Sequence, residues 1–317
     1  MPAQKPSCVV LGGSGFIGTN LCRRLLASGH RVRAFGRHCR FPDKLRGVEW
    51  YQGDFSDPDS VAAAIETFDF VFHLVHGAMP QAANLAMAAD VQRNVIPSIT
   101  LLELCSKLGV RRVIFSSSGG TIYGCPAQIP TPEVAPTDPI CAYGISKLAI
   151  EKYLTLHEHL YSLDFRVLRI ANPFGPFQIP WKGQGFIAAA VSRALSGQPI
   201  EIWGDGSVVR DFVFVDDVVD AFEAAMTDTS NTRVFNIGTG EGRSLTDVIA
   251  AIERLLDVKL SIKWARGRSL DIPISVLAID RAREVLEWEP KTSFETGLAM
   301  TMEWTRQNRS EIDKLYR

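Results

Sequence analysis

Three glycines, Gly12, Gly15 and Gly18, stand at GxxGxxG spacing between a short apolar run and a longer stretch with helical periodicity. The run is typical of a buried strand, and the stretch is typical of a helix. Glycines at this spacing permit a tight turn and let the backbone approach a pyrophosphate at the N-terminus of the helix. The turn therefore predicts a dinucleotide site that includes Phe16 and Ile17, with a merely tight turn as the plain alternative.

The first half of the chain alternates short apolar runs with amphipathic stretches, as repeated βαβ units do. Strands are predicted at residues 7–11, 31–35, 49–52, 70–74, 112–116 and 165–169, and helices at residues 16–28 and 142–160. This alternation predicts an α/β fold with a doubly wound parallel sheet.

The chain changes character after Asn172, where segments punctuated by proline and glycine indicate loops around short elements. We therefore expect two domains, a dinucleotide-binding domain at residues 1–171 and a smaller mixed α/β substrate lobe at residues 172–317. Residues 211–240 again contain strand and helix patterns, so part of this segment is expected to return to the first sheet.

Charge and apolar patterning argue against several classes of function. The formal net charge is −1 with 22% charged residues, so no overall field attracts nucleic acid. No apolar stretch reaches the ~18 residues that a membrane span needs. Residues 1–6 lack the apolar core of a secretory signal, so a cytoplasmic protein is expected. The six cysteines form no CxxC pair and do not cluster with histidine, so no metal site is predicted.

Tyr143 and Lys147 stand four residues apart in the predicted helix of residues 142–160. Residues at this spacing share one face of a helix, so the lysine ammonium can lie beside the phenol and favour its phenolate. Such a phenolate is a base for a hydroxyl proton. Chance can produce this spacing in a chain with six tyrosines, and the pair gains weight from the glycine turn upstream.

The residues after the second predicted strand leave the identity of the cofactor open. An NAD site usually has an acidic residue there to bind the adenosine 2′-hydroxyl, but this chain has Gly36. Arg37 follows, and its guanidinium could bind a 2′-phosphate, so the sequence permits NADP and does not exclude NAD. Asp54 and Phe55 stand where the adenine would lie, and Asn94 stands where the nicotinamide end would lie.

Eight motifs follow one another along nearly the whole chain: GGSGFIG, GDFSD, SSSGGTIYG, YGISK, NPFG, WGDGSVVRDFVFVDD, FNIGTG and RSLDIP. In this order they resemble the extended short-chain dehydrogenases/reductases, and among them the nucleotide-sugar epimerase/dehydratase family. The resemblance implies a Rossmann lobe that binds NAD, a smaller lobe that binds a UDP-sugar, and a homodimer formed through helices that include the one with Tyr143. It also implies cofactor contacts at Leu74, Ser116 and Pro173.

In the family that the chain resembles, the tyrosine is the catalytic acid/base, and the lysine tunes it and holds the nicotinamide ribose. The resemblance assigns these roles to Tyr143 and Lys147. A serine or threonine four residues before the tyrosine of the YG pair assists at the sugar 4-oxygen. That position is Gly119 here, so Ser118 is the predicted catalytic hydroxyl, with Thr121 as the next nearest. Dehydratases place an acidic pair just after this hydroxyl, and its absence argues against 4,6-dehydration.

The resemblance also implies a set of substrate contacts. Asn172 is similar to an asparagine that contacts the phosphates of the sugar nucleotide. Arg210 and Arg268 are similar to two residues that clamp the diphosphate, for which a guanidinium is well shaped. Ser275 stands where related 4-epimerases vary between bulky and small side chains, and a small one leaves room for a 2-acetamido group. The remaining predicted contacts are Asp271 beside Arg268, and Gln184, Gly185 and Phe186 around the base.

These residues favour reversible C4 epimerisation of a UDP-sugar, either the glucose/galactose pair or the N-acetylated pair. Tyr143 would take the 4-hydroxyl proton while hydride passes to the nicotinamide, and the hydride would return to the other face of the 4-keto sugar. One alternative is NADPH-dependent reduction of a 4-keto nucleotide sugar, which Gly36 and Arg37 favour. The other is a non-catalytic protein that senses nucleotides, which the intact Tyr143 and Lys147 pair disfavours.

Overall fold

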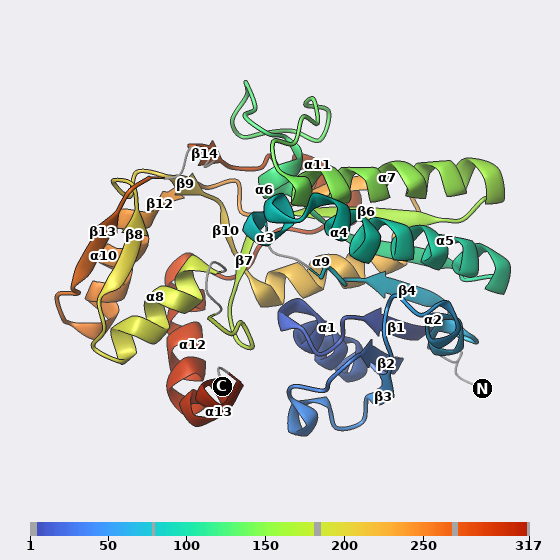
Figure 1. The fold of residues 1–317 in the computed structure, drawn as a ribbon, viewed down its shortest axis with the longest axis horizontal. Helices are drawn as coiled ribbons and strands as arrows, with labels where there is room; N and C mark the ends of the chain where they lie inside the picture. Colours follow the sequence, from blue (N-terminus) through green and yellow to red (C-terminus); the bar gives the residue numbers. More distant parts are fainter. Residues whose placement is uncertain (1–4, 78–79, 181–184, 268–271, 316–317) are drawn as a thin grey trace.

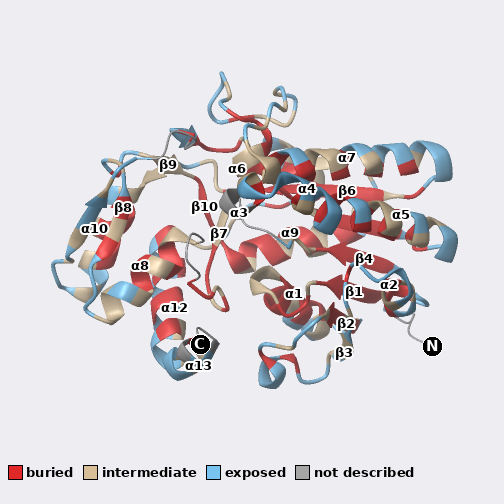
Figure 2. Cartoon of the chain, viewed as in Figure 1, coloured by how far each residue is buried: buried red, intermediate tan, exposed pale blue. Residues whose placement is uncertain are grey.

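The structure, a computed structural model, describes residues 5–77, 80–180, 185–267 and 272–315. A layered α/β body occupies the centre and right of Figure 1, and a smaller lobe lies at the left. The central strands are buried over most of their length, whereas the loops and the outer faces of the helices are exposed (Figure 2).

The larger body is built on a seven-stranded sheet whose paired neighbours are all parallel. In spatial order the strands are β3 (Glu49–Gln52), β2 (Arg31–Gly36), β1 (Ser7–Leu11), β4 (Phe70–His73), β5 (Arg112–Ser118), β6 (Phe165–Ile170) and β11 (Val234–Ile237). The strand order reverses on either side of β1, as in a Rossmann fold. The predicted doubly wound parallel sheet is therefore confirmed, and all six predicted strands belong to it.

Helices cover both faces of this sheet, and each face has its own apolar core (Figure 1). One layer consists of α1 (Phe16–Ala27), α9 (Val215–Thr227) and α11 (Asp280–Leu286), and the other of α2 (Pro58–Ile65), α5 (Ile96–Leu108) and α7 (Ala142–Tyr161). Because central parallel strands are covered on both faces, β1 and β4 are nearly continuous apolar runs and are buried throughout. Within the described residues, no helix combines the length and the apolar character needed to cross a membrane.

Short helical elements connect these layers. They are η1 (Pro42–Leu45), α3 (Pro80–Leu85), α4 (Met87–Asp90), η2 (Val91–Val95) and α6 (Gly119–Ile122). α4, η2 and α5 follow one another without a break. α6 follows β5 directly, so it lies at the carboxyl edge of the sheet, where it packs against α7.

The smaller lobe combines short strand pairs with helices. β8 (Ile200–Trp203) pairs with β13 (Ile262–Ala265), β9 (Val209–Arg210) lies between β12 (Arg243–Ser244) and β14 (Ile274–Ser275), and β7 (Asn172–Phe174) pairs with β10 (Phe212–Phe214). The apolar core of this lobe is enclosed by α8 (Phe186–Leu195), α10 (Leu245–Leu256) and α12 (Phe294–Gln307), and α13 (Arg309–Leu315) follows α12.

The chain passes between the two lobes more than once. After β10, α9 packs on the main sheet, and β11 then pairs with β6, with Phe235 opposite Leu168. β10 itself does not join the main sheet, because it pairs with β7. A segment far along the sequence thus completes the sheet of the larger body.

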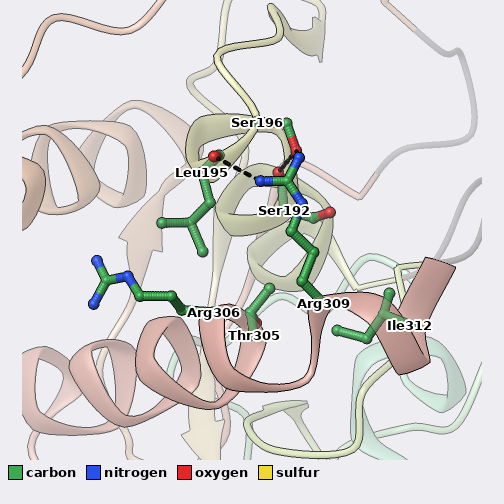
Figure 3. A pocket seen from close by; sticks show the side chains of 7 residues that line it. All are labelled: Ser192, Leu195, Ser196, Thr305, Arg306, Arg309 and Ile312. Atoms are coloured by element: carbon green, nitrogen blue, oxygen red, sulfur yellow. Dashed lines mark hydrogen bonds between the residues drawn. The ribbon is translucent and has the colours of Figure 1, made fainter.

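A small cavity lies between α8, α12 and α13 (Figure 3). Arg309 donates hydrogen bonds beside it, to the carbonyl of Leu195 at 3.3 Å and to Oγ of Ser196 at 3.1 Å. None of the residues predicted to bind nucleotide or sugar lines this cavity, so we assign it no part in the site.

Candidate active site

The glycine turn between β1 and α1 is shaped to hold a pyrophosphate. The amides of Gly12 and Gly13 donate to the carbonyl of Phe35 on β2, at 2.9 and 3.3 Å, which holds the turn against the sheet. Gly12 has φ +86°, and a Cβ on Gly18 would stand 2.2 Å from the carbonyl oxygen of Gly12. No side chain caps the N-terminus of α1, which leaves its first amide groups for an anion. These residues therefore fit a dinucleotide.

The other predicted residues of the turn lie at the start of α1. Gly15 is the N-cap, and its amide donates to the carbonyl of Gly12 at 2.9 Å. Phe16 packs on an aromatic cluster with Phe41, and Ile17 packs on the apolar core between the sheet and the layer of α1, α9 and α11. Because both side chains are used in packing, the cofactor contact predicted for them requires their amide groups.

β2 ends at Gly36, and an acidic residue could not replace this glycine without crowding Trp50. A Cβ at residue 36 would lie 3.3 Å from the Trp50 ring. Arg37 is exposed, and the loop that it begins is tied to the glycine turn, because the amide of Arg40 donates to Oγ of Ser14 at 2.5 Å. The structure thus places Arg37 in a loop anchored on the turn and leaves no carboxylate at residue 36.

Asp54 and Phe55 follow β3, and Leu74 follows β4. The carboxylate of Asp54 accepts hydrogen bonds from the hydroxyl and the amide of Ser56, at 2.7 and 2.9 Å. These bonds, with a smaller contribution from Arg37, hold the pKa of Asp54 below its ordinary value. The ring of Phe55 is buried in the core on the α2 face, and Leu74 packs on the core of the opposite face. Asp54 therefore closes a turn and remains exposed and charged.

α7 brings Tyr143 and Lys147 together at the carboxyl edge of the main sheet. Lys147 is buried, and its Nζ donates to the carbonyl of Ser116 on β5 at 2.7 Å. The same Nζ lies 5.7 Å from the centre of the Tyr143 ring. Two residues on one helix face thus form a phenol–amine pair, and Ser116 contributes its backbone rather than its side chain to holding the amine.

Burial dominates the protonation of both groups. It lowers the pKa of Lys147 to about 7, although Glu151 and Asp90 act in the opposite direction. Burial also raises the pKa of Tyr143 well above its ordinary value, and a hydrogen bond with Ser118 opposes this shift. The site by itself therefore holds a neutral phenol beside an amine that loses its proton near pH 7. The phenolate of our hypothesis requires a further positive charge.

The hydroxyl beside the phenol belongs to Ser118, the last residue of β5. Gly119, at the offset where the family has serine or threonine, is closely packed, since a Cβ there would lie 2.4 Å from a methyl group of Leu277 and 3.0 Å from the carbonyl oxygen of Arg169. The Oγ1 of Thr121 is buried and has no hydrogen-bond partner in the described part of the chain. Of the two candidate hydroxyls, that of Ser118 thus acts on the pKa of the Tyr143 phenol, whereas that of Thr121 makes no hydrogen bond to it.

Predicted substrate residues from the smaller lobe meet the larger body at α6. Asn172 Nδ2 and Ser275 Oγ lie 4.0 and 3.9 Å from the position that a Cβ on Gly120 would occupy. Arg210 stands opposite Ser275 in the β9–β14 pair, and its half-buried guanidinium donates to the carbonyl of Ile272 at 2.6 Å. Asn172, Ser275 and Arg210 therefore lie along one border between the lobes.

The other predicted contacts of the smaller lobe lie in β7, at the start of α8, or outside the described residues. Pro173 lies in β7, opposite Val213 of β10. Gly185, with φ +65°, is the N-cap of α8, and Phe186 is the first residue of that helix and packs on the core of the lobe. Gln184, Arg268 and Asp271 lie outside the described residues.

Asn94 belongs to a buried polar cluster that the sequence analysis did not foresee. Its Oδ1 accepts the amide of Gly77 at 2.7 Å, and its Nδ2 donates to Asp90 at 2.9 Å. Asp90 also accepts the hydroxyl of Ser146, which lies on α7 close to Tyr143, at 2.5 Å. The side chain of Asn94, predicted to contact the cofactor, thus has both polar ends bonded within the protein. No pattern in the sequence connects residue 90 with residue 146.

A second buried cluster adjoins Lys147. Glu151, one turn later on α7, accepts hydrogen bonds from Arg169 Nη2 at 2.7 Å and from Ser117 Oγ at 2.6 Å. Arg169 in turn donates to the hydroxyl of Tyr123 at 2.9 Å. The spacing of four residues that joins Lys147 to its tyrosine also joins it to Glu151, so the same helical rule could have found this residue.

The fold and the site define a class of enzyme. A parallel sheet with a glycine turn after its first strand, and a Tyr–Lys pair on a helix at its carboxyl edge, is the arrangement of the extended short-chain dehydrogenases/reductases. Within the described residues, no group of histidine, cysteine, aspartate and glutamate could hold a metal ion. Residues 8–238 match the NAD dependent epimerase/dehydratase family, and the chain belongs to this family. The family resemblance found in the sequence, and NAD as the cofactor of the family, are thereby confirmed.

Relatives match the chain over almost its whole length. A UDP-glucose 4-epimerase of Mycolicibacterium smegmatis is 36% identical over 314 residues, which is 96% of this chain and 99% of the relative. The crystal structure of a UDP-glucose 4-epimerase from Thermotoga maritima with UDP-glucose has a TM-score of 0.91 and 36% identity, covering 96% of this chain and 99% of that one. A Thermus thermophilus UDP-glucose 4-epimerase in complex with NAD has a TM-score of 0.89 and 31% identity, covering 95% and 99%.

Proposed function

We propose that the protein catalyses the reversible C4 epimerisation of a UDP-sugar. The observation that carries the proposal is the border between the lobes, where Asn172 of the smaller lobe approaches Gly120 of α6. This short helix follows Ser118 directly and packs against α7, which carries Tyr143 and Lys147. This arrangement allows a sugar hydroxyl to reach the phenol while the rest of the nucleotide lies on the smaller lobe. The activity named for the relatives, UDP-glucose 4-epimerase, supports the same reaction here.

Tyr143 is the acid/base of this mechanism. Its oxygen takes the proton of the 4-hydroxyl and later returns it, and Ser118, whose side chain lowers the pKa of the phenol against the effect of burial, positions the sugar 4-oxygen. Lys147 is fixed by the carbonyl of Ser116, so its charge acts on the phenol from a constant position. The glycine turn would hold NAD, which when bound would supply the hydride chemistry at C4 and, through its positive ring, the charge that the site lacks on its own.

Inversion at C4 requires that the sugar turn while its diphosphate stays bound. Asn172 and Arg210 hold the diphosphate on the smaller lobe, so the reacting carbon never leaves the neighbourhood of Tyr143. Gly120 contributes no side chain near Asn172 and Ser275, so no side chain at this position hinders the sugar.

The Tyr143→Phe variant tests this mechanism. Interconversion of UDP-glucose and UDP-galactose, followed by chromatography, should fall by roughly 100-fold or more, because the acid/base is lost. Binding of NAD should stay near the wild-type value, since the ring remains. Tyr153→Phe on the same helix is the matched control and should retain activity. Wild-type activity in Tyr143→Phe would remove the phenol from the mechanism.

Net reduction of a 4-keto nucleotide sugar by NADPH is the second candidate. It is favoured by the missing carboxylate at Gly36 and by Arg37 in the loop beside the glycine turn. The purified protein should be denatured and its released nucleotide identified, and NADPH consumption should be measured with the substrate. Release of NAD and no net consumption support epimerisation, whereas one NADPH oxidised per product formed supports reduction.

We extend the proposal to the N-acetylated UDP-hexose pair because Ser275 is small. Its Oγ lies near Gly120, and a bulky side chain in place of Ser275 would fill the space beside that glycine. Ser275→Tyr should lose activity on the N-acetylated pair and keep activity on UDP-glucose and UDP-galactose. A wild-type protein that interconverts only the unsubstituted pair would contradict this extension.

We also propose a homodimer formed through α5 and α7, which pack side by side. Their outer faces carry apolar residues that are strongly exposed, namely Ile96 at 52%, Ile145 at 55% and Leu160 at 55%. Large exposed apolar side chains on packed neighbouring helices can mark a protein–protein interface, here with a second copy of the chain. Light scattering should give the mass of a dimer for the wild type and of a monomer for Leu160→Glu, while Leu255→Glu on α10 should stay dimeric. A monomeric wild type would contradict the proposal.

The proposed lobes are residues 1–171 and 172–317, with α9 and β11 assigned to the dinucleotide-binding body. The pairing of β11 with β6 supports this assignment. Val218 and Phe222 of α9 support it too, because they belong to the same apolar core as Leu168 of β6.

A further inference from the structure

His76 lies on the path between the glycine turn and Tyr143. It follows β4, the strand between β1 and β5, so its segment crosses the carboxyl edge of the sheet between the two. The segment is held on both sides. The backbone of Leu74 lies 3.4 Å from the position of a Cβ on Gly12, and the amide of Gly77 donates to Asn94. A dinucleotide that extends from the turn to Tyr143 has to pass this segment.

The ring of His76 is buried against the phenol but lacks hydrogen bonds. The two ring centres are 4.3 Å apart with planes at 66°, and the His76 side chain is only 8% exposed. Neither ring nitrogen has a hydrogen-bond partner among the residues that the structure describes. The carboxylate of Asp90 is 3.6 Å from Nε2, which is longer than a hydrogen bond. Buried polar atoms nearly always have partners, so we take these nitrogens as available to a bound ligand.

The groups around His76 determine the protonation state of its ring, and therefore which hydrogen bonds the ring can make to a ligand. Burial, with repulsion from Lys147 and His73, lowers the pKa of His76 far below its ordinary value, so the ring is neutral. A neutral imidazole has one N–H donor and one acceptor nitrogen. Asp90 lies nearest to Nε2 and favours the tautomer with the proton there, which leaves Nδ1 as the acceptor.

We propose that His76 binds the nicotinamide riboside half of the cofactor and accepts, at Nδ1, a hydrogen bond from a ribose hydroxyl or from the carboxamide. The pyrophosphate at the glycine turn and the reacting ring at Tyr143 fix the two ends of this half, and His76 lies between them. The proposal rests on NAD binding in this cleft and does not depend on which sugar reacts.

Two variants of the full chain test the proposal by titration with NAD and with ADP, which lacks the nicotinamide riboside. His76→Phe keeps the ring beside Tyr143 and removes both nitrogens, so NAD affinity should fall about tenfold, or ~1.4 kcal/mol. His76→Asn places an amide oxygen near the position of Nδ1 and should stay within about threefold of the wild type. ADP affinity should be the same in all three proteins. NAD binding by His76→Phe at the wild-type affinity, or an equal loss for ADP, would overturn the proposal.

Thermal unfolding without ligand gives a readout that a merely structural role would not produce. Because the ring nitrogens have no partner in the protein, His76→Phe should be at least as stable as the wild type while it binds NAD more weakly. A lower melting temperature in His76→Phe would show that the nitrogens are already bonded within the protein, and the proposal would fail. Titration with ADP-ribose, which has the ribose but lacks the nicotinamide, identifies the group that His76 binds. If His76→Phe loses as much affinity for ADP-ribose as for NAD, the hydrogen bond is to the ribose, and if it loses none, the bond is to the carboxamide.

Discussion

Neutralising Glu151 should destabilise the protein strongly, because its charge is paired deep behind the site. Its carboxylate faces Arg169 Nη2 at 2.7 Å and Nε at 3.2 Å, and the two side chains are only 6% and 7% exposed. Glu151→Gln keeps the shape but leaves the guanidinium without its counter-charge, which typically costs about 3–5 kcal/mol. Arg169 keeps hydrogen bonds to the Tyr123 hydroxyl and to the Glu133 carbonyl. We therefore expect the free energy of unfolding to fall by an amount near the lower end of this range, about 3 kcal/mol.

Urea and thermal unfolding at pH 7 measure this loss, and about 3 kcal/mol corresponds to a melting temperature lower by roughly 6 °C. The matched control is Glu158→Gln on the same helix, because Glu158 pairs with Arg233 where the side chains are 32% and 26% exposed. A partly exposed pair is worth less than about 1 kcal/mol. Replacing both buried partners, as Glu151→Leu with Arg169→Met, should recover part of the loss. If Glu151→Gln is no more destabilising than Glu158→Gln, the buried pair is not the stabilising element inferred here.

Three further predictions concern the helices and the turn. Burial lowers the pKa of Lys147 to about 7, against about 10.4 in an unfolded chain. The unfolded chain therefore binds more protons between these values, so wild-type stability should rise from pH 7 to pH 9.5 relative to Lys147→Met. Urea unfolding of both proteins at the two pH values checks this. If the difference in the free energy of unfolding between wild type and Lys147→Met is the same at pH 7 and pH 9.5, the prediction is wrong. Gly18→Ala would place its Cβ 2.2 Å from the Gly12 carbonyl, so NAD titration should show affinity lower by roughly tenfold or more. Unaltered binding would argue against the turn as the pyrophosphate site. Ser244→Ala removes the capping box that Ser244 forms with Asp247 at the start of α10 and should cost about 1 kcal/mol in thermal unfolding with no change in NAD affinity.

The main sheet was predictable because its signals are local. Several strands of the first half, such as β1 and β4, are apolar runs of the right length, and glycine, proline or polar residues mark their ends. The glycine turn and the Tyr143–Lys147 pair were predictable for the same reason, since spacing alone places them on a turn and on one helix face. Their role in binding and catalysis stays a prediction.

The strand partners of the smaller lobe were not predictable, because they depend on contacts between distant segments. Residues 212–214 have the composition of a core strand, yet as β10 they pair with β7, and only β11 joins the main sheet. β9, β12 and β14 have two residues each, which is too short for any periodicity.

The buried polar clusters were hidden for a similar reason. Asp90 and Ser146 meet because α4 and α7 pack together, and no pattern in the sequence of either helix predicts this contact. His76 stands in an apolar context that resembles a strand end, and its importance arises only from the ring that packs against it.

The late arrival of β11 has a consequence for how the chain is made. β6 has β5 on one side, and its other side stays open until residues 234–237 have left the ribosome. At about 5–20 residues per second, translation of the intervening segment takes several seconds, during which unpaired amides and carbonyls line an edge. Such an edge can recruit a strand from a neighbouring nascent chain. Shielding of this edge during synthesis should therefore increase the amount of folded protein that a cell recovers.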